Sequence, residues 1–160
     1  MTIKAGDRLP TMTLTVATAE GPKPTPSDDI FKGKTVALFA VPGAFTPTCS
    51  AKHLPSFKQQ APTLKSKGVD TIACISVNDG FVMKAWGEDQ AVGDDILMLA
   101  DGNGDFTKAV GLEMDGSKFG MGGRSQRYSM IVKDGVVTTL NVEAPGEYKV
   151  SAADYMLNQL

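Results

Sequence analysis

The sequence has few residues that bind metals or form disulfides. Its 160 residues include one histidine and two cysteines, Cys49 and Cys74. One histidine and two distant cysteines do not supply the close ligand set of a zinc site, so we expect no metal and no other cofactor. Few cysteines and no apolar export segment favour a reducing, cytoplasmic compartment. An organelle stays open as an alternative, because a removed transit segment would leave no trace.

Long apolar runs and an excess of basic charge are also missing. The longest apolar stretch, residues 36–41, has the length of a strand and is far shorter than the roughly 18 residues of a membrane span. Sixteen basic and eighteen acidic residues give a net charge of −2. This balance offers no basic surface for a nucleic-acid backbone. We therefore expect neither a membrane nor a nucleic-acid partner.

The pattern along the chain predicts a single α/β domain over residues 1–160. An apolar fraction of 42% and a charged fraction of 21% are ordinary values for a globular protein of this length. Strands and helices alternate, and a hairpin at Lys133-Asp134-Gly135 makes the sheet mixed rather than parallel. Strands are expected at residues 11–16, 35–41, 69–77, 96–100, 128–132 and 136–142, and helices around residues 54–68, 80–86, 105–110 and 151–160.

Four local features carry expectations of their own. The proline-rich residues 22–26 are typical of an extended surface connection. Pro55 predicts a break or kink in the first long helix, because proline cannot donate the next helical hydrogen bond. Residues 115–123 are rich in glycine and are expected to form a loop. Ser151 is expected to cap the last helix.

Residues 42–49, PGAFTPTC, are the most informative segment. They place Cys49 directly after a central strand and at the start of a helix, where unpaired N–H groups and the helix dipole stabilise a thiolate. Ionisation alone raises the reaction rate only modestly. A thiol with a pKa of about 8.5 is about 3% ionised at pH 7, so its full ionisation raises the rate only about 30-fold. Fast chemistry needs further donors, and Thr46 and Arg127 are the candidates.

This segment resembles the active-site motif of the peroxiredoxins, Pro-x3-Thr-x2-Cys, through Pro42, Thr46 and Cys49. The longer form PGAFTPTCS, residues 42–50, is similar to the type II (peroxiredoxin-five) group in particular. The likeness covers nearly the whole chain. It continues through residues 52–55, 76–79, 99–104, 124–128, 140–143 and 150–151.

The resemblance implies a thioredoxin-like fold, with a central mixed sheet flanked by helices, and a thiol peroxidase activity. Cys49 would reduce hydrogen peroxide and organic hydroperoxides through a sulfenic acid, Thr46 and Arg127 would hold the peroxide, and Pro42 would shield the thiolate. Relatives with a C-terminal resolving cysteine carry it near residues 148–152, where this chain has none. The resemblance therefore implies an external reductant, glutaredoxin with glutathione or thioredoxin, and a homodimer.

Several residues have two interpretations. Cys74 lies in a buried apolar strand and is either a core thiol, which we favour, or a resolving cysteine, which would need a Cα within about 7 Å of its partner. His53 shares a helix face with Cys49 and is more simply structural than a base. Arg124 is more simply structural or interfacial than catalytic. A further set of residues forms either an apolar dimer patch or part of the core: Phe45, Phe81, Trp86 and Phe119.

Two other functions remain as alternatives. One is a redox sensor or chaperone-like binding protein in which Cys49 oxidises once without rapid turnover. The other is a thiol–disulfide oxidoreductase. The second is disfavoured because Thr46 stands where thioredoxin-type enzymes carry the first cysteine of Cys-x-x-Cys.

Overall fold

The central strand of the protein, β3 (Thr35–Val41), is buried on both faces. In the computed structural model, which describes residues 2–160, six consecutive residues of this strand are fully buried. Alternate side chains enter two separate core clusters: Ala37, Phe39 and Val41 enter one, and Val36, Leu38 and Ala40 the other. A strand covered on both sides needs an unbroken apolar run, which explains its composition.

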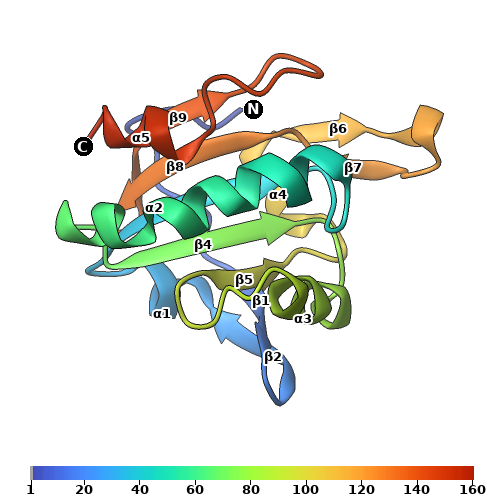
Figure 1. Ribbon diagram of the computed structural model, residues 1–160, viewed down its shortest axis with the longest axis horizontal. Coiled ribbons are helices and arrows are strands. Elements are labelled where there is room, and N and C mark those ends of the chain that lie inside the picture. The colour runs from blue at the N-terminus through green and yellow to red at the C-terminus, as the bar shows by residue number, and fades with distance from the viewer. Residues whose placement is uncertain (1) are drawn as a thin grey trace.

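Six further strands complete the main sheet, in the order β2-β1-β5-β4-β3-β8-β9 (Figure 1). Strands β3, β4 and β5 are parallel, and the other pairs are antiparallel. The sheet is therefore mixed, as the sequence predicts. The bounds of the six are β1 Thr13–Thr18, β2 Gly21–Pro26, β4 Thr71–Ser76, β5 Leu97–Ala100, β8 Tyr128–Lys133 and β9 Val136–Val142.

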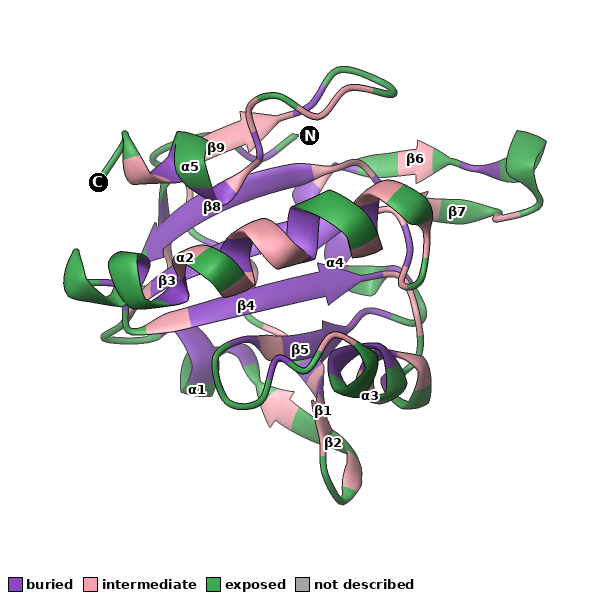
Figure 2. Cartoon of the chain, in the orientation of Figure 1, coloured by how far each residue is buried: buried purple, intermediate pink, exposed green. Residues whose placement is uncertain are grey.

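Helices cover both faces of this sheet. The first core cluster takes residues from α2 (Leu54–Ser66), α3 (Gly80–Asp89) and α5 (Ala153–Leu157), and the second from α1 (Ser27–Phe31) and α4 (Asp105–Val110). Figure 2 shows the buried residues running along β4 and β8, with the exposed residues on the outer sides of the helices. The predicted α/β class with helices on a mixed sheet is confirmed. No helix in the described part of the chain is long and apolar enough to cross a bilayer.

The helical segment after β3 begins with a wide turn. Residues 49–53 form a π-helix, η1 (Cys49–His53), in which the Leu54 N–H reaches the Cys49 carbonyl. Regular α2 starts at Leu54, one residue before Pro55. Proline has no N–H and its ring crowds the carbonyl four residues earlier, so a wider turn fits here. The irregularity expected near Pro55 is therefore a change of helix type.

One expectation about connections is wrong and one holds. The proline-rich residues 22–26 belong to β2, which pairs with β1 at the edge of the sheet, where missing N–H donors are tolerated. The glycine-rich segment forms a loop over residues 116–122, which contains the 3₁₀ turn η2 (Ser117–Phe119). This loop joins two short strands that were not predicted, β6 (Glu113–Asp115) and β7 (Gly123–Ser125), in a two-stranded ribbon that projects from the sheet (Figure 1). Gly120 and Gly122 have positive φ angles and turn the ribbon back.

The expected cap of the last helix is also wrong. Helix α5 begins at Ala153 with Ala152 at its N-cap, and the Ala153 N–H donates to the Ser56 hydroxyl of α2 at 3.2 Å. The Ser151 hydroxyl instead donates to the Glu143 carboxylate at 2.6 Å. A serine side chain can bond either to the backbone of a helix start or to another polar group, and here it bonds to the carboxylate eight residues earlier.

Candidate active site

Two residues predicted from the sequence, Cys49 and Arg127, lie in contact. Strand β8 runs antiparallel to β3, with Tyr128 opposite Ala40, so the residue before β8 lies beside the end of β3. Cys49 reaches the same edge because it follows β3 after a short loop. The Arg127 Nη2 donates to the Cys49 Sγ at 3.1 Å, and Cys49 is fully buried.

The second guanidinium nitrogen of Arg127 contacts the only histidine of the chain. Arg127 Nη1 lies 2.9 Å from the His53 Nδ1, and the His53 Nε2 lies 2.9 Å from the Ser151 carbonyl oxygen. A carbonyl only accepts, so the ring hydrogen is on Nε2 and Nδ1 accepts from Arg127. Burial first, and then the Arg127 charge, lower the pKa of His53 to about 3. His53 is therefore neutral and has no free lone pair with which to act as a base.

The loop between β3 and η1 is held by polar contacts of its own. The Thr46 hydroxyl donates to the Gly43 carbonyl at 2.7 Å, so its hydrogen is committed within the loop and its oxygen lone pairs remain as acceptors. The Asn78 side-chain oxygen accepts from the Ala44 N–H at 3.0 Å and from the Ser76 hydroxyl at 2.6 Å. This role of Asn78 was not predicted, although a polar residue just beyond the end of a buried strand is a signal for it.

Arg124 lies on the other side of the same loop. Its Nε donates to the Met121 carbonyl at 2.9 Å and its Nη1 to the Pro42 carbonyl at 3.4 Å. A Cβ on Gly43 would lie only 3.0 Å from that Nη1, so glycine at this position leaves room for the arginine to approach the loop. Arg124 thus ties the ribbon to the loop, which agrees with the structural interpretation of this residue.

The four aromatic residues of the suggested patch do not behave alike. Trp86 is fully buried, and its Nε1 donates to the Ser50 hydroxyl at 3.0 Å, which fixes the residue next to Cys49. Phe45, Phe81 and Phe119 are exposed by 52%, 70% and 77%. Trp86 therefore belongs to the core, and only the three phenylalanines remain available on the surface.

Cys74 lies in the middle of β4, opposite Phe39 of β3, and is fully buried. It belongs to the same core cluster as Cys49, on the face covered by α2 and α3. Burial, followed by the influence of Cys49, raises the pKa of the Cys74 thiol well above its usual value. Both cysteines are free thiols. Within residues 2–160, no three His, Cys, Asp or Glu side chains are grouped to hold a metal ion.

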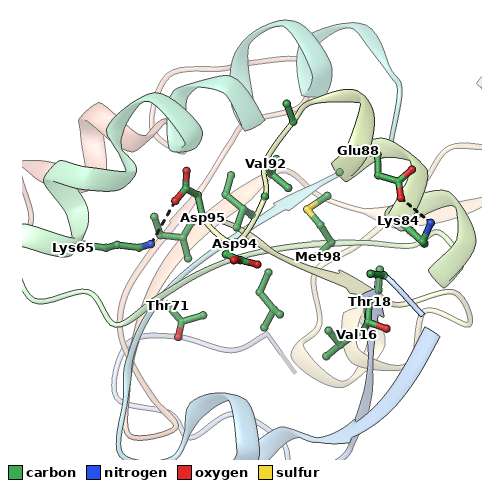
Figure 3. A pocket seen from close by; sticks show the side chains of 18 of the residues that line it. Val16, Thr18, Lys65, Thr71, Lys84, Glu88, Val92, Asp94, Asp95 and Met98 are labelled. Atoms are coloured by element: carbon green, nitrogen blue, oxygen red, sulfur yellow. Dashed lines mark hydrogen bonds and ion pairs between the residues drawn. The ribbon is translucent and has the colours of Figure 1, made fainter. Parts of the chain in front are cut away.

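A cleft of about 570 Å³ lies away from this cysteine (Figure 3). It is lined by the first residues of β4 and β5, including Thr71 and Leu97, whereas Cys49 lies beyond the last residues of β3. Since these strands are parallel, the cleft and the thiol occupy opposite edges of the sheet. Ion pairs of Lys65 with Asp95 and of Lys84 with Glu88 border the cleft. No cysteine or histidine lines this cleft, so the candidate active site is at the buried Cys49.

We expect His53 to make the stability of the protein depend on pH. An unfolded chain has an ordinary histidine pKa of about 6.5, so between pH 6.5 and 3 the unfolded state binds more protons than the folded state. The free energy of unfolding should fall as the pH drops below about 6.5, by up to about 1.4 kcal/mol per pH unit. Urea unfolding of wild type and His53→Gln between pH 7 and 5 measures this. Equal slopes for the two proteins would contradict the prediction.

Comparison with known proteins places this geometry in a family. Residues 4–157 match the Redoxin family. Rice chloroplastic peroxiredoxin-2E-2 is 51% identical over 164 residues, which cover 99% of this chain and 73% of that protein. The reduced Prx3 of Vibrio vulnificus, solved in complex with H2O2, is 58% identical, with 98% of each chain covered and a TM-score of 0.93. Peroxiredoxin 5 of Alvinella pompejana is 40% identical, covers 88% of this chain and 90% of its own, and has a TM-score of 0.81. The chain belongs to the Redoxin family and is a peroxiredoxin of the type II (peroxiredoxin-five) group, a thiol peroxidase.

Proposed function

We propose that Cys49 is the peroxidatic nucleophile of this peroxiredoxin and that Arg127 holds it as a thiolate. The contact of 3.1 Å between Arg127 Nη2 and Cys49 Sγ carries the proposal. A hydrogen bond from a guanidinium to an anion is charge-assisted, and it is stronger away from water than at the surface. The first turn of the helical segment adds N–H groups that favour the anion.

In the first step, the Cys49 sulfur attacks one peroxide oxygen and the O–O bond breaks. The sulfur loses two electrons and becomes a sulfenic acid, and the departing oxygen takes a proton and leaves as water or an alcohol. An external thiol then attacks the sulfenic sulfur, which releases water and forms a mixed disulfide. A second thiol breaks that disulfide and returns Cys49 to the thiolate.

We assign the surrounding residues by what they offer the peroxide. The Arg127 fork keeps further N–H donors for the oxygen on which negative charge develops. The Thr46 oxygen, whose hydrogen is bound to Gly43, would accept from the peroxide O–H. Pro42 would shield the thiolate from water. The H2O2 held by the Vibrio vulnificus relative supports hydrogen peroxide as a substrate, and organic hydroperoxides share the same O–O bond.

The reductant is proposed to be glutaredoxin with glutathione, or thioredoxin. Residues 148–152 contain no cysteine, and the other thiol of the chain, Cys74, is buried in mid-strand. A buried thiol with a raised pKa is a poor nucleophile toward a sulfenic acid. We therefore keep Cys74 as a core thiol and assign resolution to a thiol from outside the chain.

We also propose that the protein forms a homodimer through the face around Phe45, Phe81 and Phe119. Phe45 lies in the active-site loop, Phe81 in the first turn of α3, and Phe119 in the ribbon tied to that loop by Arg124. Phe45 and Phe81 follow the carboxyl ends of β3 and β4, and the ribbon that carries Phe119 leads into the start of β8 at the same edge of the sheet. Covering them would remove apolar surface from water and close the active-site edge.

A cytoplasmic location is proposed on chemical grounds. Both thiols are free and the catalytic cycle needs a reducing thiol pool. Relatives of the group include proteins named chloroplastic and mitochondrial, and those compartments also hold reducing thiols. Fractionation of cells that produce the protein, followed by immunodetection, would reveal its compartment.

Replacing the nucleophile or its partner separates the roles at the site. Cys49→Ser should abolish peroxide consumption with the fold intact, because a hydroxyl is not ionised at neutral pH. Arg127→Gln should lower the second-order rate constant by at least about 100-fold, since charged donors to the departing oxygen are lost. Stopped-flow consumption of H2O2 measures both. Retained turnover in Cys49→Ser would refute the assignment, and a wild type that reacts once and stalls with reductant present would indicate a sensor.

Replacing the second cysteine tests the source of the resolving thiol. Cys74→Ser should keep most peroxidase activity when glutaredoxin and glutathione are supplied, because the attacking thiol comes from outside. Mass measurement after one equivalent of H2O2 should find Cys49 oxidised without an intramolecular disulfide in the wild type. Loss of activity in a folded Cys74→Ser variant, or a Cys49–Cys74 disulfide, would instead make Cys74 the resolving residue.

Introducing charge on the exposed apolar face tests the dimer. Phe81→Asp should shift the protein from dimer to monomer in sedimentation velocity at micromolar concentration, because a carboxylate would be buried unpaired at the contact. Tyr155→Asp is the matched control, since Tyr155 is a similarly exposed aromatic residue on α5. A monomeric wild type, or equal behaviour of the two variants, would reject this interface.

A further inference from the structure

Glu143 is a buried carboxylate with no cationic partner in the described structure, and the peroxidase chemistry does not use it. It follows β9 directly and is only 6% exposed. Its two oxygens accept from the backbone N–H of Lys149, Val150 and Ser151 at 2.8 to 2.9 Å. The Ser151 hydroxyl donates to it at 2.6 Å. Burial works to raise the pKa of Glu143, but these hydrogen bonds outweigh burial and lower it, so the group is an anion.

The contacts of Glu143 fix the loop that joins β9 to α5 (red in Figure 1). Three consecutive N–H groups converge on one carboxylate, which turns the backbone around it. Ser151 is bound twice, through its N–H and its hydroxyl, and is fully buried. Its carbonyl group therefore has a single direction, and that direction is toward the His53 Nε2 at 2.9 Å.

The hydrogen bonds continue to the reactive sulfur and then close on themselves. The His53 Nδ1 accepts a hydrogen bond from the Arg127 Nη1, and the Arg127 Nη2 donates to the Cys49 sulfur. The backbone of Arg127 also accepts from the Glu143 N–H at 2.9 Å. Glu143, Ser151, His53 and Arg127 thus form a closed ring of hydrogen bonds. A closed ring holds each member by two contacts, so displacing one displaces the next.

We propose that Glu143 is a positioning residue for the Cys49 thiolate: it fixes the Ser151 carbonyl, which holds His53 in the tautomer that aims Arg127 at the sulfur. The physical reason is that a neutral imidazole carries its hydrogen on only one of its two nitrogens. If Nε2 lost its acceptor, the ring hydrogen would be free to occupy Nδ1, and an N–H there would face the Arg127 N–H. The guanidinium would then turn away and leave the sulfur without its charged donor. This inference rests on the proposed role of Arg127.

The single histidine makes the arrangement directly observable. In ¹⁵N-imidazole NMR, every ring signal belongs to His53. Two titratable or charged groups face this ring directly: the Arg127 guanidinium and Tyr148, whose ring centroid lies 5.4 Å away. Cys49 is linked to the ring through Arg127, and Glu143 through Ser151. We expect the wild type at pH 7 to carry its hydrogen on Nε2 with Nδ1 bare. A hydrogen on Nδ1 in the wild type would overturn the proposal without any variant.

Variants of Glu143 test the consequence for the thiol. In Glu143→Ala we expect mixed tautomers of His53 and a pH profile of Cys49 alkylation moved upward by about one pH unit. The rate with H2O2 should then fall about tenfold at pH values well below the wild-type midpoint. Glu143→Gln, whose amide oxygen still accepts from Ser151, should stay within about threefold of the wild-type rate. The matched control is Glu147→Ala, because Glu147 lies in the same loop but pairs only with Lys149 at the surface.

A general loosening of the loop would lower the melting temperature without moving the tautomer or the alkylation profile. Unchanged tautomer, profile and rate in a folded Glu143→Ala variant would therefore overturn the proposal, as would an equal effect of Glu147→Ala. If Glu143→Ala does not fold, the wild-type tautomer and Glu143→Gln decide. Turnover that survives Cys49→Ser would refute the proposed function itself. If instead Cys49→Ser is inactive, but Glu143→Ala keeps the wild-type tautomer, alkylation profile and rate, only the positioning role is refuted.

Discussion

The mechanism that we propose depends on keeping one buried sulfur, that of Cys49, charged. Cys49 is fully buried, and an unpaired buried anion is too costly to persist, so a cation has to lie within hydrogen-bond distance. Arg127 meets this need only because β8 is antiparallel to β3 and begins where β3 ends. The mixed character of the sheet is therefore a requirement of the site: a parallel strand in the place of β8 would begin at the opposite edge.

The same requirement explains the polar residues around the sulfur. A guanidinium brought into a half-buried site carries several N–H groups that need acceptors. His53 supplies one, and it is neutral because burial, and then the charge of Arg127, disfavour its protonated form. Ser50, held by Trp86, and Ala44, held by Asn78, fix the backbone on either side of the cysteine. Each contact is ordinary, and together they leave the sulfur and Arg127 little freedom.

The sequence was sufficient for the features that depend on local pattern. The alternation of strands and helices, with the hairpin at Lys133-Asp134-Gly135, predicted the fold class. The cysteine after β3 and the arginine before a strand were the candidates that the structure brings together. Two features were missed because they depend on hydrogen-bond partners that the local residue pattern does not reveal. The alternating prolines of β2 gave the pattern of a linker, because prolines are found in strands almost only at sheet edges. Ser151 gave the pattern of a helix cap, and only the folded chain reveals the competing Glu143, eight residues earlier.

The prolines of β2 limit the ways in which two molecules can pair through their sheet edges. Pro22, Pro24 and Pro26 alternate along the strand, so the positions that donate to β1 are the residues between them. The outer side of β2 therefore presents carbonyl oxygens but no N–H groups at these three positions. A second sheet could not add a strand there, because each new rung needs a donor from both chains. The proline edge thus blocks strand addition at these three positions and removes one route to aggregation.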